Sequence, residues 1–186
     1  RFGIAGAAVL LAVLLGAGDA IAAELPKWQV DKSRSSIAFI ASGGGSEVRG
    51  NAGGYEVTIS LDPGVPGAAA VEVVIQAAQL ATGVAAVDPV LVGPDILDAA
   101  AHPQIVFQAG ELRTTAADAY ELPGTLSIKG IEKPAVLAFT LAVAGNEAHA
   151  VGGVTLNRLD FGVGTGLGDQ VAAEVRIEVD LVAKRQ

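Results

Sequence analysis

Alternation of apolar and polar side chains dominates the chain beyond residue 28. Within residues 55–61 every odd-numbered position is apolar, and the positions between them hold Glu, Thr and Ser. Residues 171–182 show the same alternation over a longer span, with apolar side chains at the odd-numbered positions. Successive side chains of a β-strand point to opposite faces of a sheet, so both stretches predict strands with one buried face.

Strands of this kind follow one another at short spacing, and turn residues such as the glycines of 42–46 and 62–64 separate them. No helix alternates with them, as a parallel sheet would require. The fold class predicted is therefore all-β: an eight-stranded antiparallel lipocalin-like barrel with a short helical insertion. The predicted strands cover residues 28–31 with 36–40, 55–61, 71–75, 104–108, 121–128, 135–141, 149–158 and 171–182.

Two segments interrupt the series of strands. Residues 84–100 combine an Asp88-Pro89 start signal with helical spacing of Leu91, Ile96 and Leu97, so they predict one or two short helices. Residues 161–168 contain four glycines and predict a flexible loop, which we expect at the mouth of any cavity.

Residues 1–23 have the pattern of a signal peptide. A positive Arg1 precedes an apolar run at 4–15, and the small residues Ala20 and Ala22 fit a cleavage site next to Ala23. The run is shorter than the roughly 20 residues of a membrane-spanning helix. We therefore expect export to the periplasm or outside the cell, a single barrel domain over 24–186, and no stable membrane anchor once the leader is removed.

Composition narrows the possible partners. The net charge is −8 and the 12 Lys and Arg residues are scattered, which argues against nucleic-acid binding. Cysteine is absent, so the domain has no disulfide and no thiolate metal site. Aromatic residues make up 4% of the chain, and the core must consist mainly of aliphatic side chains. The oligomeric state stays open, a homodimer included.

Signals for catalysis are weak. His102 and His149 are the only histidines, and they match no metal-binding or nucleophile motif. The glycines of 162–168 do not have the spacing of a dinucleotide-binding loop. We predict that the protein is not an enzyme and has no metal or cofactor. An envelope hydrolase is the alternative, and it requires a carboxylate and a nucleophile beside one histidine.

Five short segments, in the same order and spacing, resemble the YceI-like family of polyisoprenoid-binding proteins. The resemblance covers nearly the whole chain beyond residue 28. It implies an extended antiparallel barrel whose elongated cavity holds a long isoprenoid lipid, either a polyprenol or an isoprenoid quinone. The segments are residues 28–31 with 35–39, 54–55 with 59–63, 81–83 with Asp88, Leu91, 96–98 and 102–107, 124–134 and 157–164.

The predicted ligand-binding residues are mostly the apolar alternators of the strands. Burying a lipid tail requires apolar area and no reactive group. The same side chains can instead fill a dry core, which would make the chain a secreted structural or interaction barrel without a ligand. The predicted set is Phe39, Tyr55, Val57, Val73, Phe107, Leu126, Phe139, Leu156, Arg158 and Phe161, and the inward face also includes Val175 and Ile177.

Two polar members of this set have alternative roles. Arg158 can meet a polar head of the ligand, or it can form an ion pair with Asp160 or another carboxylate and fix the glycine-rich loop. Tyr55 can offer its hydroxyl to a quinone oxygen, or it can be packed in the core. The main functional hypothesis is a protein that sequesters or carries a long apolar lipid in the cell envelope.

Overall fold

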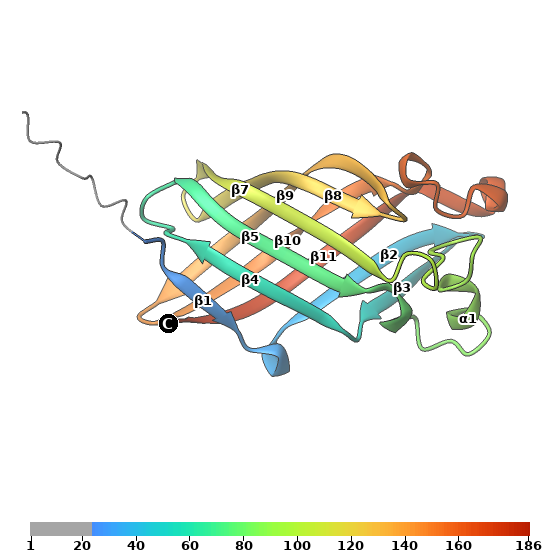
Figure 1. Ribbon diagram of the computed structural model, residues 1–186, viewed down its shortest axis with the longest axis horizontal. Helices are drawn as coiled ribbons and strands as arrows, with labels where there is room; N and C mark the ends of the chain where they lie inside the picture. The colour runs from blue at the N-terminus through green and yellow to red at the C-terminus, as the bar shows by residue number, and fades with distance from the viewer. Residues whose placement is uncertain (1–23) are drawn as a thin grey trace, which may run out of the picture.

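The computed structural model describes residues 24–186, so the predicted leader at 1–23 lies outside the described residues. One antiparallel sheet forms nearly all of the fold (Figure 1). None of the helices within 24–186 is long and apolar enough to cross a membrane. The strands are β1 (Lys27–Val30), β2 (Ser36–Gly43), β3 (Ser46–Ala52), β4 (Tyr55–Leu61), β5 (Gly67–Gln76), β6 (Leu80–Ala81), β7 (Gln104–Ala116), β8 (Ala119–Ile128), β9 (Ile131–Ala144), β10 (Glu147–Asn157) and β11 (Val171–Arg185).

The sheet closes into a barrel with eight strand positions. Strands β1 and β2 both pair with β11, one after the other along it. Strands β3 and β4 share the next position, because β3 pairs with β2 and β4 pairs with β1. Strands β5 and β6 share the third in the same way. The predicted eight-stranded antiparallel barrel is thus confirmed, with three of its strands each broken in two.

The three breaks are neighbours across the sheet. The 3-10 helix η1 (Lys32–Arg34) separates β1 from β2, Gly53 and Gly54 separate β3 from β4, and η2 (Ala77–Gln79) separates β5 from β6. Backbone hydrogen bonds from Gly53 to Gln79 and from Gln76 to Gly54 join the second break to the third. The Tyr55 hydroxyl donates to the Ser35 carbonyl and joins the second break to the first. A belt of irregular backbone therefore crosses these three positions.

Two helical segments, the insertion between β6 and β7 and the connection between β10 and β11, lie at the same end of the barrel, opposite the end that holds the C-terminus (Figure 1). The insertion between β6 and β7 contains one short helix, α1 (Asp88–Leu91), followed by turns. The Asp88 carboxylate does not cap this helix but accepts hydrogen bonds from the Thr82 hydroxyl and backbone N–H. These bonds, chiefly that from the hydroxyl, lower the pKa of the Asp88 carboxyl. The predicted glycine-rich loop at 161–168 falls on the 3-10 helices η3 (Arg158–Phe161) and η4 (Thr165–Gln170) and on residues 162–164 between them.

The core divides into two parts along the barrel axis. At the end that holds the C-terminus, apolar side chains from β1, β4, β5 and β7–β11 fill the interior. Trp28 belongs to this cluster and donates its indole N–H to the Leu61 carbonyl, and Leu112 at its centre is 1% exposed. We call this part the filled half. The other part, beneath the helical segments, is the hollow half, which contains the cavity described below.

Candidate functional site: an internal apolar cavity

The hollow half encloses a cavity of about 300 Å³. Its walls are side chains of β2, β3 and β5–β11, and its end wall comes from the insertion and from the segment that contains η3 and η4. None of the buried members of the filled half reaches it. Val73, Phe107 and Leu137 line the cavity and also pack against the filled half, so they form its floor.

The cavity wall is aliphatic and aromatic almost throughout. Ser42 and Thr82 are its uncharged polar residues, and the Thr82 hydroxyl donates to the Asp88 carboxylate; Arg158 is the one charged residue in the wall. An apolar wall of this kind can remove the surface of an apolar ligand from water.

Arg158 does not offer free donors to the cavity. Its guanidinium is buried, with 4% of the residue exposed, and donates five hydrogen bonds to backbone carbonyls. Five is the full number of N–H donors on an arginine side chain. None of these five partners is a carboxylate, so the ion pair considered with Asp160 is not formed. The residue therefore fixes the loop, through carbonyl oxygens of Val163, Gly164, Gly168, Val171 and Ala172.

The other predicted ligand-binding residues fall into two groups. Those with a side chain in the cavity wall come from five different strands, and Val175 and Ile177 of β11 join them. They are Phe39, Val73, Phe107, Leu126 and Leu156. The second group, which also points to the inside of the barrel but is not part of the wall, is Tyr55, Val57, Phe139 and Phe161.

Members of the second group are packed. Phe139 belongs to the filled half, where its ring stacks on Tyr120 with centroids 5.8 Å apart. Phe161 is 3% exposed and Tyr55 is 9% exposed, and both pack in the cluster behind the cavity wall. Burial raises the pKa of the Tyr55 phenol, whose hydroxyl donates to the Ser35 carbonyl at 3.2 Å. Val57 packs against the same cluster.

Several wall residues were not among the predicted ligand-binding residues. They are aliphatic side chains of the strands, of the insertion and of the glycine-rich segment. In the insertion, the helical spacing of Leu91, Ile96 and Leu97 indicated a buried apolar face. No sequence pattern shows that the insertion folds over the end of the barrel. The main additions are Ile37, Ile75, Leu80, Leu91, Ile96, Leu97, Ile105, Ile128, Val154 and Val163.

Glycines make room for the two phenylalanines of the wall. A Cβ atom on Gly50 of β3 would lie 2.2 Å from the ring of Phe39, the residue of β2 that is paired with Gly50. A Cβ atom on Gly124 of β8 would lie 2.9 Å from the ring of Phe107 and 2.2 Å from a backbone oxygen. Each ring therefore lies flat against a neighbouring strand, which leaves the centre of the hollow half free.

The cavity opens between two loops at the end that carries α1. Most wall residues are buried or half-buried, but Val48, Val87 and Val90 are both in the wall and exposed on the surface. Val48 follows the β2–β3 turn, and the other two belong to the insertion. These valines mark the mouth of the cavity, and the glycine-rich segment around η4 contributes Gly164 and Leu167 beside it.

Neither histidine lies in the cavity wall. His149 is on the outer face of β10, where its Nε2 lies 2.7 Å from a carboxylate oxygen of Asp180, the one side-chain hydrogen-bond partner of the ring within 24–186. His102 is half-buried, with its ring beside Gly130. Within 24–186 no three His, Cys, Asp or Glu side chains are grouped closely enough to hold a metal ion.

An eight-stranded antiparallel barrel with one internal apolar cavity is a lipocalin-like barrel. The chain belongs to the family described as YceI-like domain, whose family model matches residues 28–183. Family and fold together point to a binding protein rather than to an enzyme.

Named relatives support this assignment. A UPF0312 protein of Azotobacter vinelandii is 30% identical over 189 residues, which cover 97% of this chain and 96% of the relative. The crystal structure of BcnA from Burkholderia cenocepacia matches with a TM-score of 0.80 at 25% identity, over 84% of this chain and all of BcnA. A polyisoprenoid binding domain from Saccharophagus degradans, implicated in plant cell wall breakdown, shares the fold at a TM-score of 0.68 and 12% identity, over 86% and 98% of the two chains.

Proposed function

We propose that the protein binds a long isoprenoid lipid in its cavity and sequesters or carries it in the cell envelope. The observation that carries this proposal is the volume and chemistry of the cavity. The cavity of about 300 Å³ has about twice the volume of apolar cavities of about 150 Å³ that bind benzene. An apolar ligand that enters through the mouth would remove the apolar wall from water.

The wall chemistry favours the isoprenoid tail as the buried part of the ligand. The guanidinium of Arg158 is saturated by carbonyls, and the Tyr55 hydroxyl donates to Ser35, outside the cavity wall. A quinone oxygen inside the cavity would therefore lack a donor, which is costly for a buried polar group. We expect a polar head to stay at the mouth, where it remains in contact with water.

Similarity supports the same ligand class. A polyisoprenoid binding domain shares this fold, although at an identity that speaks for the fold alone. The location in the envelope rests on the signal-peptide pattern of residues 1–23. No catalytic step is part of the proposal, because the only buried charged residue within 24–186 is the saturated Arg158.

Native mass spectrometry of the protein isolated from its own envelope fraction tests the proposal. We expect a complex with one isoprenoid per chain, released and identified by organic extraction. A ligand-free mass that persists after incubation with polyprenols, isoprenoid quinones and fatty amides would contradict the proposal. The chain would then be an interaction barrel whose cavity has another use.

A pair of tryptophan variants on one strand locates the binding site. Leu156 of β10 lies in the cavity wall, whereas Val151 of the same strand points outward and is 44% exposed. Leu156→Trp fills part of the cavity and should lower the affinity for a polyprenol about tenfold or more. Val151→Trp should leave it unchanged, and circular dichroism checks that both variants fold. Equal affinities would show that the ligand binds elsewhere.

A further inference from the structure

Two loops around the cavity mouth carry almost no charge. We define the rim as residues 42–48, at the turn between β2 and β3, and residues 83–94 of the insertion. The rim contains two charged residues, Glu47 and Asp88, and no Lys or Arg. The Asp88 carboxylate is turned inward and accepts bonds of 2.6 and 2.7 Å from Thr82. These two loops therefore carry few charges in a protein with a net charge of −8, although Arg49 and Asp95 follow them in the chain and the Lys129 ammonium donates to the Pro94 carbonyl.

The rim is also the place where exposed apolar side chains gather. Ten large hydrophobic residues within 24–186 are exposed, and four of them belong to the rim: Val48, Val84, Val87 and Val90. Val84 and Val90 are each at least half exposed. Val48, Val87 and Val90 continue directly into the cavity wall, so the apolar surface runs from the cavity onto the outside of the molecule.

We propose that the rim docks on the surface of a lipid bilayer, with the cavity mouth facing the acyl chains. This inference rests on the proposed function, since an isoprenoid too apolar for water must be collected from and returned to a bilayer. The continuity between wall and rim gives such a lipid a path that never leaves apolar surroundings. A binding site without this use would gain nothing from exposed valines around its mouth.

The charge of the protein specifies the kind of bilayer. The rim has no Lys or Arg to attract anionic lipids, and the net charge of −8 opposes them. Binding therefore depends on shallow insertion of valines and alanines, and it is stronger on zwitterionic than on anionic surfaces. Higher salt should weaken the repulsion from anionic lipids and leave binding to zwitterionic lipids nearly unchanged.

Vesicle flotation with two charge-matched double variants tests the proposal. Val84→Asp with Ala86→Asp places two charges on exposed rim positions that are not part of the cavity wall. Val65→Asp with Ala144→Asp adds the same charge at exposed positions in the β4–β5 connection and at the end of β9, and both of these connections lie at the opposite end of the barrel (Figure 1). On phosphatidylcholine vesicles without isoprenoids, we expect the rim variant to bind about tenfold more weakly than the parent protein. The control variant should bind like the parent.

A fluorescent label gives an independent measurement, because the chain has no cysteine. Val84→Cys and Val65→Cys, each labelled with a polarity-sensitive dye, report on the rim and on the opposite end. A blue shift with phosphatidylcholine vesicles is expected for the rim label alone. Equal shifts at both positions, or none at either, would overturn the proposal.

The outcomes separate docking from ligand binding. A rim variant that still binds a polyprenol by native mass spectrometry but no longer floats with vesicles supports both proposals. Unchanged flotation of the rim variant overturns docking and leaves the cavity function intact. Rim-dependent flotation of a protein that binds no polyprenol overturns the cavity function alone. No flotation of the parent protein, with or without phosphatidylglycerol in the vesicles, overturns docking and points to a protein partner at the rim.

Discussion

Arg158 organises the loop beside the cavity mouth through hydrogen bonds to five carbonyl oxygens. A buried guanidinium without a carboxylate is costly, and the carbonyl dipoles around it must supply the compensation. These carbonyls belong to the segment 163–172. Apart from the strand pairing of β11, few backbone hydrogen bonds join this segment to the rest of the barrel. The arginine is thus part of the framework that positions Gly164 and Leu167 at the mouth.

Replacing Arg158 with methionine should destabilise the protein strongly. The change keeps an apolar stem but leaves up to five carbonyls without donors, so we expect a loss of about 3–5 kcal/mol in the free energy of unfolding. Arg158→Lys should also be destabilising, because an ammonium has three donors on a single atom. Urea denaturation measures both. A loss below about 1 kcal/mol for Arg158→Met would show that the loop does not depend on these bonds.

Which residues face inward could be predicted from the sequence, but which of them line the cavity could not. Alternation along a strand distinguishes the inner from the outer face of the barrel. It carries no information on the level along the barrel axis. Phe107 and Phe139 both alternate inward, yet one lies at the cavity floor and the other in the filled half. Fixing the glycine-rich loop was one of the two roles predicted for Arg158, but the predicted carboxylate partner was wrong, because its partners are backbone carbonyls.

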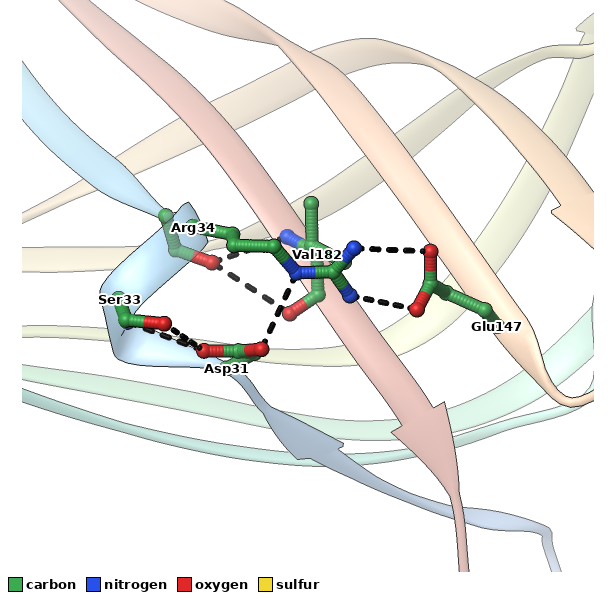
Figure 2. A network of polar contacts seen from close by, with 6 residues as sticks. Asp31, Ser33, Arg34, Glu147 and Val182 are labelled. Atoms are coloured by element: carbon green, nitrogen blue, oxygen red, sulfur yellow. Dashed lines mark hydrogen bonds and ion pairs between the residues drawn. The ribbon is translucent and has the colours of Figure 1, made fainter.

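At the scale of elements, the break between β1 and β2 is held by a local polar network (Figure 2). The Asp31 carboxylate accepts bonds from Ser33 and from the Arg34 side chain, and Arg34 also forms a two-point contact with Glu147 at the start of β10. The Ser35 hydroxyl accepts a bond from the Val182 N–H at 2.9 Å. The strand can therefore change course without losing contact with β11.

This network should make the stability of the protein depend on pH. The hydrogen bond with Arg34 lowers the pKa of the Glu147 carboxyl, and bonds from Ser33 and Arg34 lower that of Asp31. Because the folded-state pKa values are lowered, the contribution is complete above the ordinary carboxyl pKa of about 4 and is lost as the pH falls through the lowered values. Arg34→Gln should therefore lower the melting temperature at pH 7 but not in strong acid.

A second arginine serves as the control for this prediction. Arg113 pairs with Glu111 on its own strand, so this contact joins no separate elements. Arg113→Gln should have a smaller effect on the melting temperature at pH 7 than Arg34→Gln. Thermal unfolding followed by circular dichroism across the acid range provides the comparison. Equal effects of the two variants would contradict a special role for the network.

Strand β3 shows why some elements were missed in the sequence. Its inward positions include Gly50 and Ala52, whose small side chains give no alternation signal. The space above Gly50 is filled by the ring of Phe39 from the neighbouring strand. The apolar side chain at this place on the inner face of β3 therefore comes from β2, and the sequence of β3 alone does not show the alternation of a strand. Strand β7 extends to Ala116, beyond the predicted 104–108. Its second part is mostly exposed and lacks a regular apolar alternation, so the sequence did not indicate this extension.

At the scale of the whole molecule, the filled half and the hollow half should respond differently to loss of side-chain volume. Leu112 is fully enclosed in the filled half, and Leu126 borders the cavity. Leu112→Ala creates a new void and should cost about 4–5 kcal/mol in the ligand-free protein. Leu126→Ala enlarges an existing one and should cost only about 2–3 kcal/mol. Denaturant titration of the two variants measures the difference, and equal losses would mean that both halves are packed alike.

The eight-stranded barrel as a whole could be predicted, because it follows from the number and spacing of strands. The two halves could not, since they depend on where three strands break and on how the insertion covers one end. Breaks at 32–34, at Gly53 and Gly54, and at 77–79 show no common sequence signal. They become neighbours only once the register of the sheet is fixed.

The floor formed by Val73, Phe107 and Leu137 has a consequence for ligands of unequal length. A chain that enters at the mouth can advance only until it meets side chains backed by the filled half. On the proposed function, every chain long enough to reach the floor would therefore be buried to the same depth, whatever its total length. A homologous series of tails would gain affinity with each added unit up to that depth and then level off, with the surplus left protruding. The affinity would thus depend on the length of chain that the cavity can bury and not on the total length of the ligand.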